Sequence, residues 1–123
     1  MESFRDLIAW QKAMALATSV YRVTDDFPRS ELYGLTMQLR RAAVAVPSDI
    51  AEGKGRISKK EFIQMLARAR GSACEVETQL EIGKNLGFIA ADVFAPLAEQ
   101  CSEVGRVING LIASIRRSLR AES

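Results

Sequence analysis

The sequence of 123 residues contains no histidine. This absence excludes Ser-His-Asp triads, most zinc sites and the Glu-x-x-His di-iron arrangement of helical-bundle enzymes. The glycine-rich stretch 52–58 has the spacing of neither a P-loop nor a dinucleotide-binding motif, and a helix end followed by a loop explains it better. A solvated or salt-bridged helix face explains Glu75, Glu77 and Glu81 better than metal ligation does. We therefore expect no enzymatic activity, no metal or other cofactor, and no small-molecule substrate.

Cysteines and long uncharged runs are also scarce. Cys74 and Cys101 are the only cysteines, and we expect two buried free thiols rather than a disulfide. No uncharged run approaches the roughly 20 apolar residues that span a bilayer. Glu2, Arg5 and Asp6 interrupt the basic-then-apolar pattern of a signal peptide. These features predict a cytoplasmic protein with no membrane partner.

Apolar residues recur at alternating spacings of three and four, the pattern of one face of an α-helix. The first such face consists of Leu7, Trp10, Met14, Ala17, Tyr21 and Thr24. Ser30 is expected to cap a second helix, Ser58 and Glu61 to form a capping box for a third, and Gly87 to end it. We predict one domain over residues 1–123, with helices at about 5–26, 31–52, 59–86 and 91–119. Four long helices with short connections favour an all-α, antiparallel up-down-up-down four-helix bundle.

The second helix carries apolar residues on two sides. One stripe consists of Leu32, Leu35, Leu39, Ala42, Val46 and Ile50, and it is expected to face the bundle core. A nearly opposite stripe consists of Tyr33, Met37, Arg40, Val44, Pro47 and Ala51. One core can cover only one stripe, so the other is predicted to be an oligomer interface with a second copy. Pro47 is expected to kink or restart this helix, and Gly53 to end it.

Basic residues gather in two places although the net charge is only +2. Lys54, Arg56, Lys59 and Lys60 surround the connection between the second and third helices, and Arg116, Arg117 and Arg120 lie near the chain's end. We place the two clusters at opposite ends of the bundle. In a ring of subunits each cluster would repeat around an axis, making all seven residues candidate nucleic-acid contacts. The simpler explanation for the second cluster is that cations complement the helix dipole.

Arg40 and Arg41 interrupt an otherwise small and apolar surface. Antiparallel pairing of the second and third helices brings them near Glu75. We therefore predict a structural ion pair between Arg40 or Arg41 and Glu75 or Glu77, within or between subunits. Phosphate binding by the two arginines is the alternative.

Several motifs stand out along the chain. The central one is the run from Gln38 to Ala43 followed by the run from Val46 to Gly53. Others are Phe27-Pro28 with Glu31, Ser58 with Glu61-Phe62, and Ala69-Arg70-Gly71-Ser72 with Glu75. Over roughly residues 4–119 the chain thus resembles the four-helix bundle proteins named after 23S rRNA intervening sequences. Asp49 stands where that family usually has asparagine, and Ala90 where a capping polar residue is common.

The resemblance implies an antiparallel four-helix bundle that assembles as a homopentamer. The family also includes the accessory protein of diversity-generating retroelements, a barrel-like pentamer thought to contact nucleic acid and a reverse transcriptase. This chain itself, RNA or DNA, and a reverse transcriptase are therefore the partners that the resemblance implies. We expect a non-enzymatic homo-oligomeric scaffold or binding module. The alternative is a nucleic-acid-binding accessory protein that acts through ringed basic patches.

Overall fold

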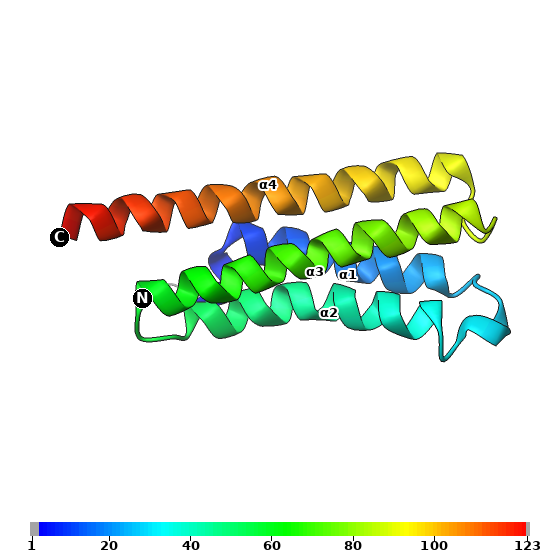
Figure 1. The fold of residues 1–123 in the computed structure, drawn as a ribbon, viewed down its shortest axis with the longest axis horizontal. Helices are drawn as coiled ribbons and strands as arrows, with labels where there is room; N and C mark the ends of the chain where they lie inside the picture. The colour runs from blue at the N-terminus through cyan, green and yellow to red at the C-terminus, as the bar shows by residue number, and fades with distance from the viewer. Residues whose placement is uncertain (1–2, 123) are drawn as a thin grey trace.

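Residues 3–122, which the computed structural model describes, form four α-helices and two short 3-10 helices. Their bounds are η1 Phe4–Asp6, α1 Ile8–Thr24, η2 Arg29–Glu31, α2 Leu35–Lys54, α3 Lys59–Asn85 and α4 Ala91–Glu122. Successive α-helices run in opposite directions, and α1 and α3 each contact both α2 and α4 (Figure 1). The expected all-α four-helix fold is therefore confirmed.

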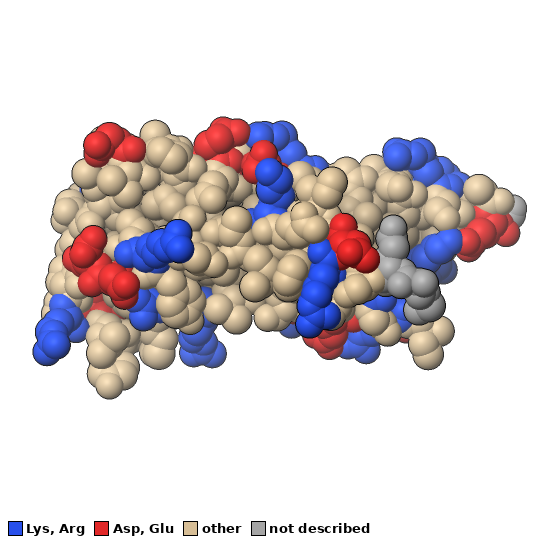
Figure 2. Space-filling model, turned by 180° about the vertical axis from the view of Figure 1, so that it is seen from behind, with Lys and Arg blue, Asp and Glu red and all other residues tan. Residues whose placement is uncertain are grey.

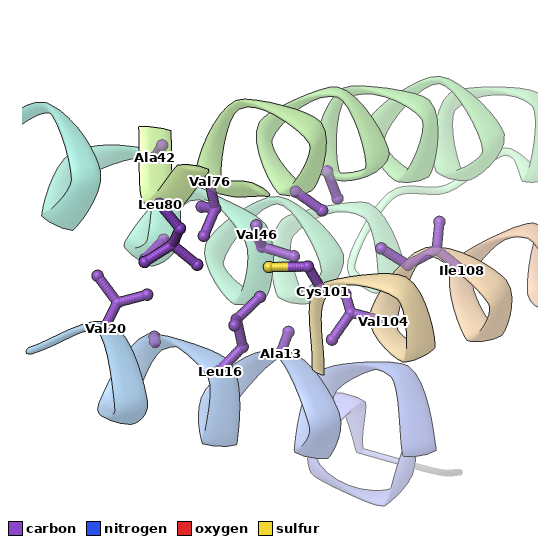
Figure 3. Close-up of a cluster of buried hydrophobic side chains, with 14 of the residues drawn as sticks. Ala13, Leu16, Val20, Ala42, Val46, Val76, Leu80, Cys101, Val104 and Ile108 are labelled. Carbon is purple, nitrogen blue, oxygen red and sulfur yellow. The ribbon is translucent and has the colours of Figure 1, made fainter. Parts of the chain in front are cut away.

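The core lies between the four helices and is almost entirely aliphatic (Figure 3). The largest fully buried side chains are Leu16, Val20, Leu39, Val46, Ile50, Leu66, Val76, Leu80, Val104 and Ile108. They come from all four helices. Detaching any one helix from the bundle would therefore expose large apolar side chains to water. Burying each of them contributes roughly 1.5–3 kcal/mol.

The face of α1 that meets the core differs from the predicted one. Two overlapping three–four repeats run along this helix, and the one with Ala9, Ala13, Leu16 and Val20 is buried. Alanine at two of these positions lets α1 approach the other helices. The predicted stripe lies to one side of this face: Met14 and Tyr21 are exposed, and Trp10 is partly buried against the core.

The second helix starts later than residue 31, at Leu35. Ser30 lies inside η2 and does not cap α2, whose N-cap residue is Gly34. The Glu31 carboxylate instead accepts a hydrogen bond from the Leu35 backbone N–H, at 3.1 Å. That bond satisfies one of the donors that a helix start leaves unpaired, so helix formation can begin four residues later.

The predicted end of α2 at Gly53 is also wrong, because the helix continues to Lys54. It passes through Pro47 without a restart. Gly53 is buried, and a Cβ there would lie 2.8 Å from Met65 Cβ and 2.9 Å from Phe62 Cδ1 on α3. The glycine therefore permits the close approach of α2 and α3 rather than stopping the helix.

The limits of α3 follow local sequence signals. The Ser58 hydroxyl accepts a hydrogen bond from the Glu61 backbone N–H, at 3.0 Å, which is one half of the expected capping box. The Glu61 carboxylate lies 3.7 Å from the Arg56 guanidinium. Gly87, two residues past the helix end, has a φ of 81°, a left-handed conformation that glycine adopts without strain.

We expect Gly53→Ala to destabilise the bundle by about 1–3 kcal/mol, because its Cβ would overlap Met65 and Phe62. Urea unfolding followed by circular dichroism measures the difference. Gly110→Ala is the matched control: its Cβ would meet no atom within 4 Å, so alanine should add up to about 1 kcal/mol of stability. Equal stability of Gly53→Ala and the wild type would contradict tight packing at this site.

Candidate functional site

A long apolar depression follows the outer surface of α1 and α2, and we call it the α1–α2 groove. It consists of two hollows of about 560 and 490 Å3 that share Tyr21 and Val44 as lining residues. From α1 it is lined by Trp10, Met14, Ala17, Thr18 and Tyr21. Figure 2, seen from the side of α1, shows a broad area without charged side chains over the middle of the molecule.

All the residues predicted for the second stripe of α2 line this groove, namely Tyr33, Met37, Arg40, Val44, Pro47 and Ala51. Tyr33, Met37 and Val44 are exposed, whereas the Pro47 ring is buried. Sequence reasoning missed the contribution of α1 to the same surface. The signal was present, because most of the three–four stripe predicted for the first helix lines the groove. Whether another molecule covers the groove stays a prediction.

Arg40 ties α2 to the C-terminal end of α1. Its Nε donates a hydrogen bond to Thr24 Oγ1, at 2.8 Å, and its Nη2 lies 3.0 Å from Asp25 Oδ1. The same nitrogen donates to the Tyr21 carbonyl, at 3.4 Å, and the guanidinium stacks 4.6 Å from the centre of the Tyr21 ring. Cations near a helix C-terminus are favourable, because the last carbonyls carry partial negative charge. Arg40 is thus a structural residue of the α1–α2 pair.

The predicted ion pair with α3 is therefore wrong for Arg40 within one subunit, because this side chain points toward α1. Among residues 3–122, Arg41, Glu75 and Glu77 have no ion-pair partner. The version of the prediction in which Arg41 meets an acidic residue of a second subunit is untested.

The two basic clusters lie at the same end of the bundle, and their placement at opposite ends is wrong. Lys59 at the start of α3 donates a hydrogen bond to Ser118 Oγ near the end of α4, at 2.7 Å, and pairs with Glu122. Figure 1 shows the reason: α2 and α4 run in the same direction, so both end beside the α2–α3 connection.

Acidic side chains neutralise part of this basic end. Arg56 lies 2.6 Å from Glu52, and Lys59 pairs with Glu122. In the described part of the chain, Lys54, Lys60, Arg116 and Arg117 take part in no ion pair. Figure 2 shows red and blue side chains together at this end of the molecule. The remaining positive charge also complements the dipole at the end of α4.

The two cysteines are free, as predicted, but only one is buried. Figure 3 shows the Cys101 sulfur in the core near Val46. Burial, with smaller effects of Glu77 and Cys74, raises the pKa of the Cys101 thiol to about 12, so this thiol stays protonated and unreactive at neutral pH. Cys74 is exposed on α3, contrary to the prediction.

Asp49, one of the two departures from the family pattern, lies on the side of α2 that faces Arg68 of α3. Partial burial raises the pKa of its carboxyl, nearby Arg68 opposes the rise and Glu52 adds to it. Ionised Asp49 therefore lowers the free energy of unfolding relative to a neutral side chain such as asparagine at this position.

The described residues contain neither a cluster of potential metal ligands nor a membrane-spanning helix. Within residues 3–122 no group of three or more His, Cys, Asp or Glu side chains could hold a metal ion. None of the helices in that range has the apolar length needed to cross a lipid bilayer. The features that remain to explain are the α1–α2 groove and the basic end.

Comparison with known proteins identifies the family. Residues 5–110 match the family model described as 23S rRNA-intervening sequence protein. The chain belongs to this family. A solved structure of a protein of unknown function from the S23 ribosomal protein family, from Bacteroides thetaiotaomicron VPI-5482, has the same fold, with a TM-score of 0.77. The two chains are 18% identical, and the match covers 85% of this chain and 98% of that one. No curated protein matches this chain.

We expect Arg40→Met to lower the free energy of unfolding by about 1–3 kcal/mol, because buried Thr24 loses its charge-assisted hydrogen bond. Asp25→Asn is the informative control. The Asp25 side chain is 77% exposed, so its ion pair with Arg40 should contribute less than about 1 kcal/mol. Urea unfolding of both variants separates the two interactions, and an effect of Asp25→Asn as large as that of Arg40→Met would contradict this assignment.

Proposed function

We propose that this protein is a non-enzymatic scaffold that assembles with copies of itself through the α1–α2 groove. The observation that carries the proposal is the apolar groove, which no part of residues 3–122 covers. Membership of the 23S rRNA-intervening sequence family agrees with an assembling protein, because the resemblance implies a homopentamer.

The distribution of exposed apolar residues supports this role. Single exposed apolar residues are ordinary on a protein surface, whereas contiguous patches mark interaction sites. The groove gathers a large share of the exposed bulky apolar side chains, namely Met14, Tyr21, Leu32, Tyr33, Met37 and Val44. Aromatic residues and methionine are the types enriched at protein interfaces. Burying these side chains against a second copy would stabilise the assembly through the hydrophobic effect, and it would not require breaking an ion pair that is buried in the subunit.

We expect Val44→Asp to dissociate the assembly into monomers of 13.5 kDa, because it puts a charged side chain, which assembly would have to remove from water, where the two apolar hollows join. Light scattering coupled to size-exclusion chromatography measures the mass, and circular dichroism checks the fold. Val93→Asp on α4 is the matched control, since Val93 is 46% exposed and Val44 is 41% exposed. A monomeric wild type, or a Val44→Asp variant of unchanged mass, would refute the proposal.

A second candidate function is binding of nucleic acid at the basic end. It is favoured by the meeting of both basic clusters at one end, which concentrates the positive charge of a chain with small net charge. The groove supplies aromatic residues, but the basic end is not lined by stacking platforms of several aromatic rings. Binding there would be directed at phosphates, with little sequence preference.

We expect wild-type protein to bind single-stranded RNA at 50 mM salt and to lose most of this affinity by 200 mM, as measured by fluorescence anisotropy. Replacing Arg116 and Arg117 by alanine should lower the salt slope by about 0.7–0.9 for each phosphate that the variant no longer neutralises. Replacing Arg22 and Arg29 by alanine, at positions away from the basic end, should leave the slope unchanged. No binding at 50 mM salt would rule out this second function.

A further inference from the structure

We propose that the α1–α2 groove of one copy receives the outward ridge of α3 from the next copy, with Arg41 of the groove paired to Glu75 of the ridge. The α3 ridge is formed by Glu75, Thr78, Glu81 and Ile82. This interface rests on the proposed self-association and names the surface that fills the groove. The two sides of each interface are then different, so each copy uses its groove toward one neighbour and its ridge toward the other.

The charge of the groove argues against a two-fold packing of the groove on itself. Arg40 and Arg41 both line it, and none of its lining residues is acidic. Arg40 is already held by Thr24 and Asp25. Arg41 has no ion-pair partner within residues 3–122, so groove-to-groove packing would cover this charge without a counter-charge. Burying an unpaired charge is costly, which favours an acidic partner surface.

The α3 ridge has the complementary composition. Glu75 and Glu81 are exposed and, in the described part of the chain, form no ion pair. Ile82 adds an exposed apolar side chain, and it borders a shallow hollow of about 450 Å3 together with Thr78 and Glu81. Carboxylates beside an apolar residue match a groove that is apolar and carries an arginine.

The groove and the ridge share no residue and belong to different helices of one subunit, the groove to α1 and α2 and the ridge to α3. The hollow beside the ridge also includes Cys74, which lies one helical turn after Arg70, and the Arg70 guanidinium donates a hydrogen bond to Asn109 Oδ1 of α4, at 2.9 Å. It therefore lies on the α3–α4 side of the bundle. The groove lies over α1 and α2, and α1 packs against α2 and α4 but not against α3 in the described residues.

The groove and the ridge also lie at the same height along the bundle. Gly53 of α2 lies directly against Phe62 and Met65 of α3. Arg41 is twelve residues before Gly53, and because antiparallel α-helices share one rise per residue, it is level with residues 74–77 of α3. Rotation about an axis parallel to the bundle keeps every copy at one height. Such a rotation therefore brings Glu75 of one copy level with Arg41 of the next.

Charge reversal tests this interface. We expect Arg41→Glu and Glu75→Arg each to raise the dissociation constant of the assembly at least about tenfold, because like charges then face each other. The double variant with both changes should regain most of the affinity, since the pair is restored with its signs exchanged. Sedimentation velocity over a concentration series measures all three, and circular dichroism confirms that each variant is folded.

Arg106→Glu on α4 is the control for a general effect of charge, because Arg106 is exposed and lies outside both surfaces. The groove-to-ridge interface is wrong if Arg106→Glu weakens assembly as much as Arg41→Glu does, or if the double variant stays as weak as the single ones. A monomeric wild type would overturn the proposed self-association itself. A wild type that assembles, together with reversals that leave its affinity unchanged, would overturn only the groove-to-ridge interface.

Discussion

The close approach of α2 to α3 at Gly53 determines how the rest of the structure is arranged. It presses one side of α2 against α3, and Leu39, Ala42, Val46 and Ile50 of α2 are buried in the core. Leu32, the first residue of the predicted core stripe, precedes α2 and is 50% exposed. The opposite stripe must then point away from the core, because a helix can bury only one face in a four-helix bundle. This stripe and the outer residues of α1 form the groove, so the groove is a consequence of how the core is packed.

Arg40 and Arg41 are adjacent in sequence but have different surroundings. Successive helical residues differ by about 100° in direction, so Arg40 reaches the end of α1 while Arg41 stays at the groove surface. The hydrogen bond to buried Thr24 gives Arg40 a role in the stability of the subunit. Arg41 is exposed and forms no ion pair within the described residues, which leaves it available to the partner surface proposed above.

Sequence periodicity predicted the fold class, most of the core face of α2 and its second stripe, because these residues repeat every three or four positions. The misplaced basic clusters were an error of topology, because α2 and α4 of an up-down-up-down bundle end on the same side. Most other wrong predictions involve single side-chain interactions or competing repeats. A glycine at position 53 can either end a helix or allow a second helix to pack closely, and the local sequence is the same in both cases. Only the position of Met65 on α3 shows that Gly53 has the second role. The partner of Arg40 depends on helix rotation, which periodicity does not specify. The two repeats of α1 differ only in side-chain size.

The two basic clusters lie at the same end of the bundle, so the proposed self-association bears directly on the proposed binding of nucleic acid. In a cyclic assembly whose axis runs along the bundle, all copies point the same way, so their basic ends gather on one face of the ring. A two-fold dimer of antiparallel copies would place them on opposite faces and halve the charge on each. Because affinity for nucleic acid rises steeply with the number of phosphates neutralised, a groove-to-ridge ring suits nucleic acid better than a two-fold dimer. Under the two proposals, the direction in which neighbouring copies point would set how much positive charge one face of the assembly presents to nucleic acid.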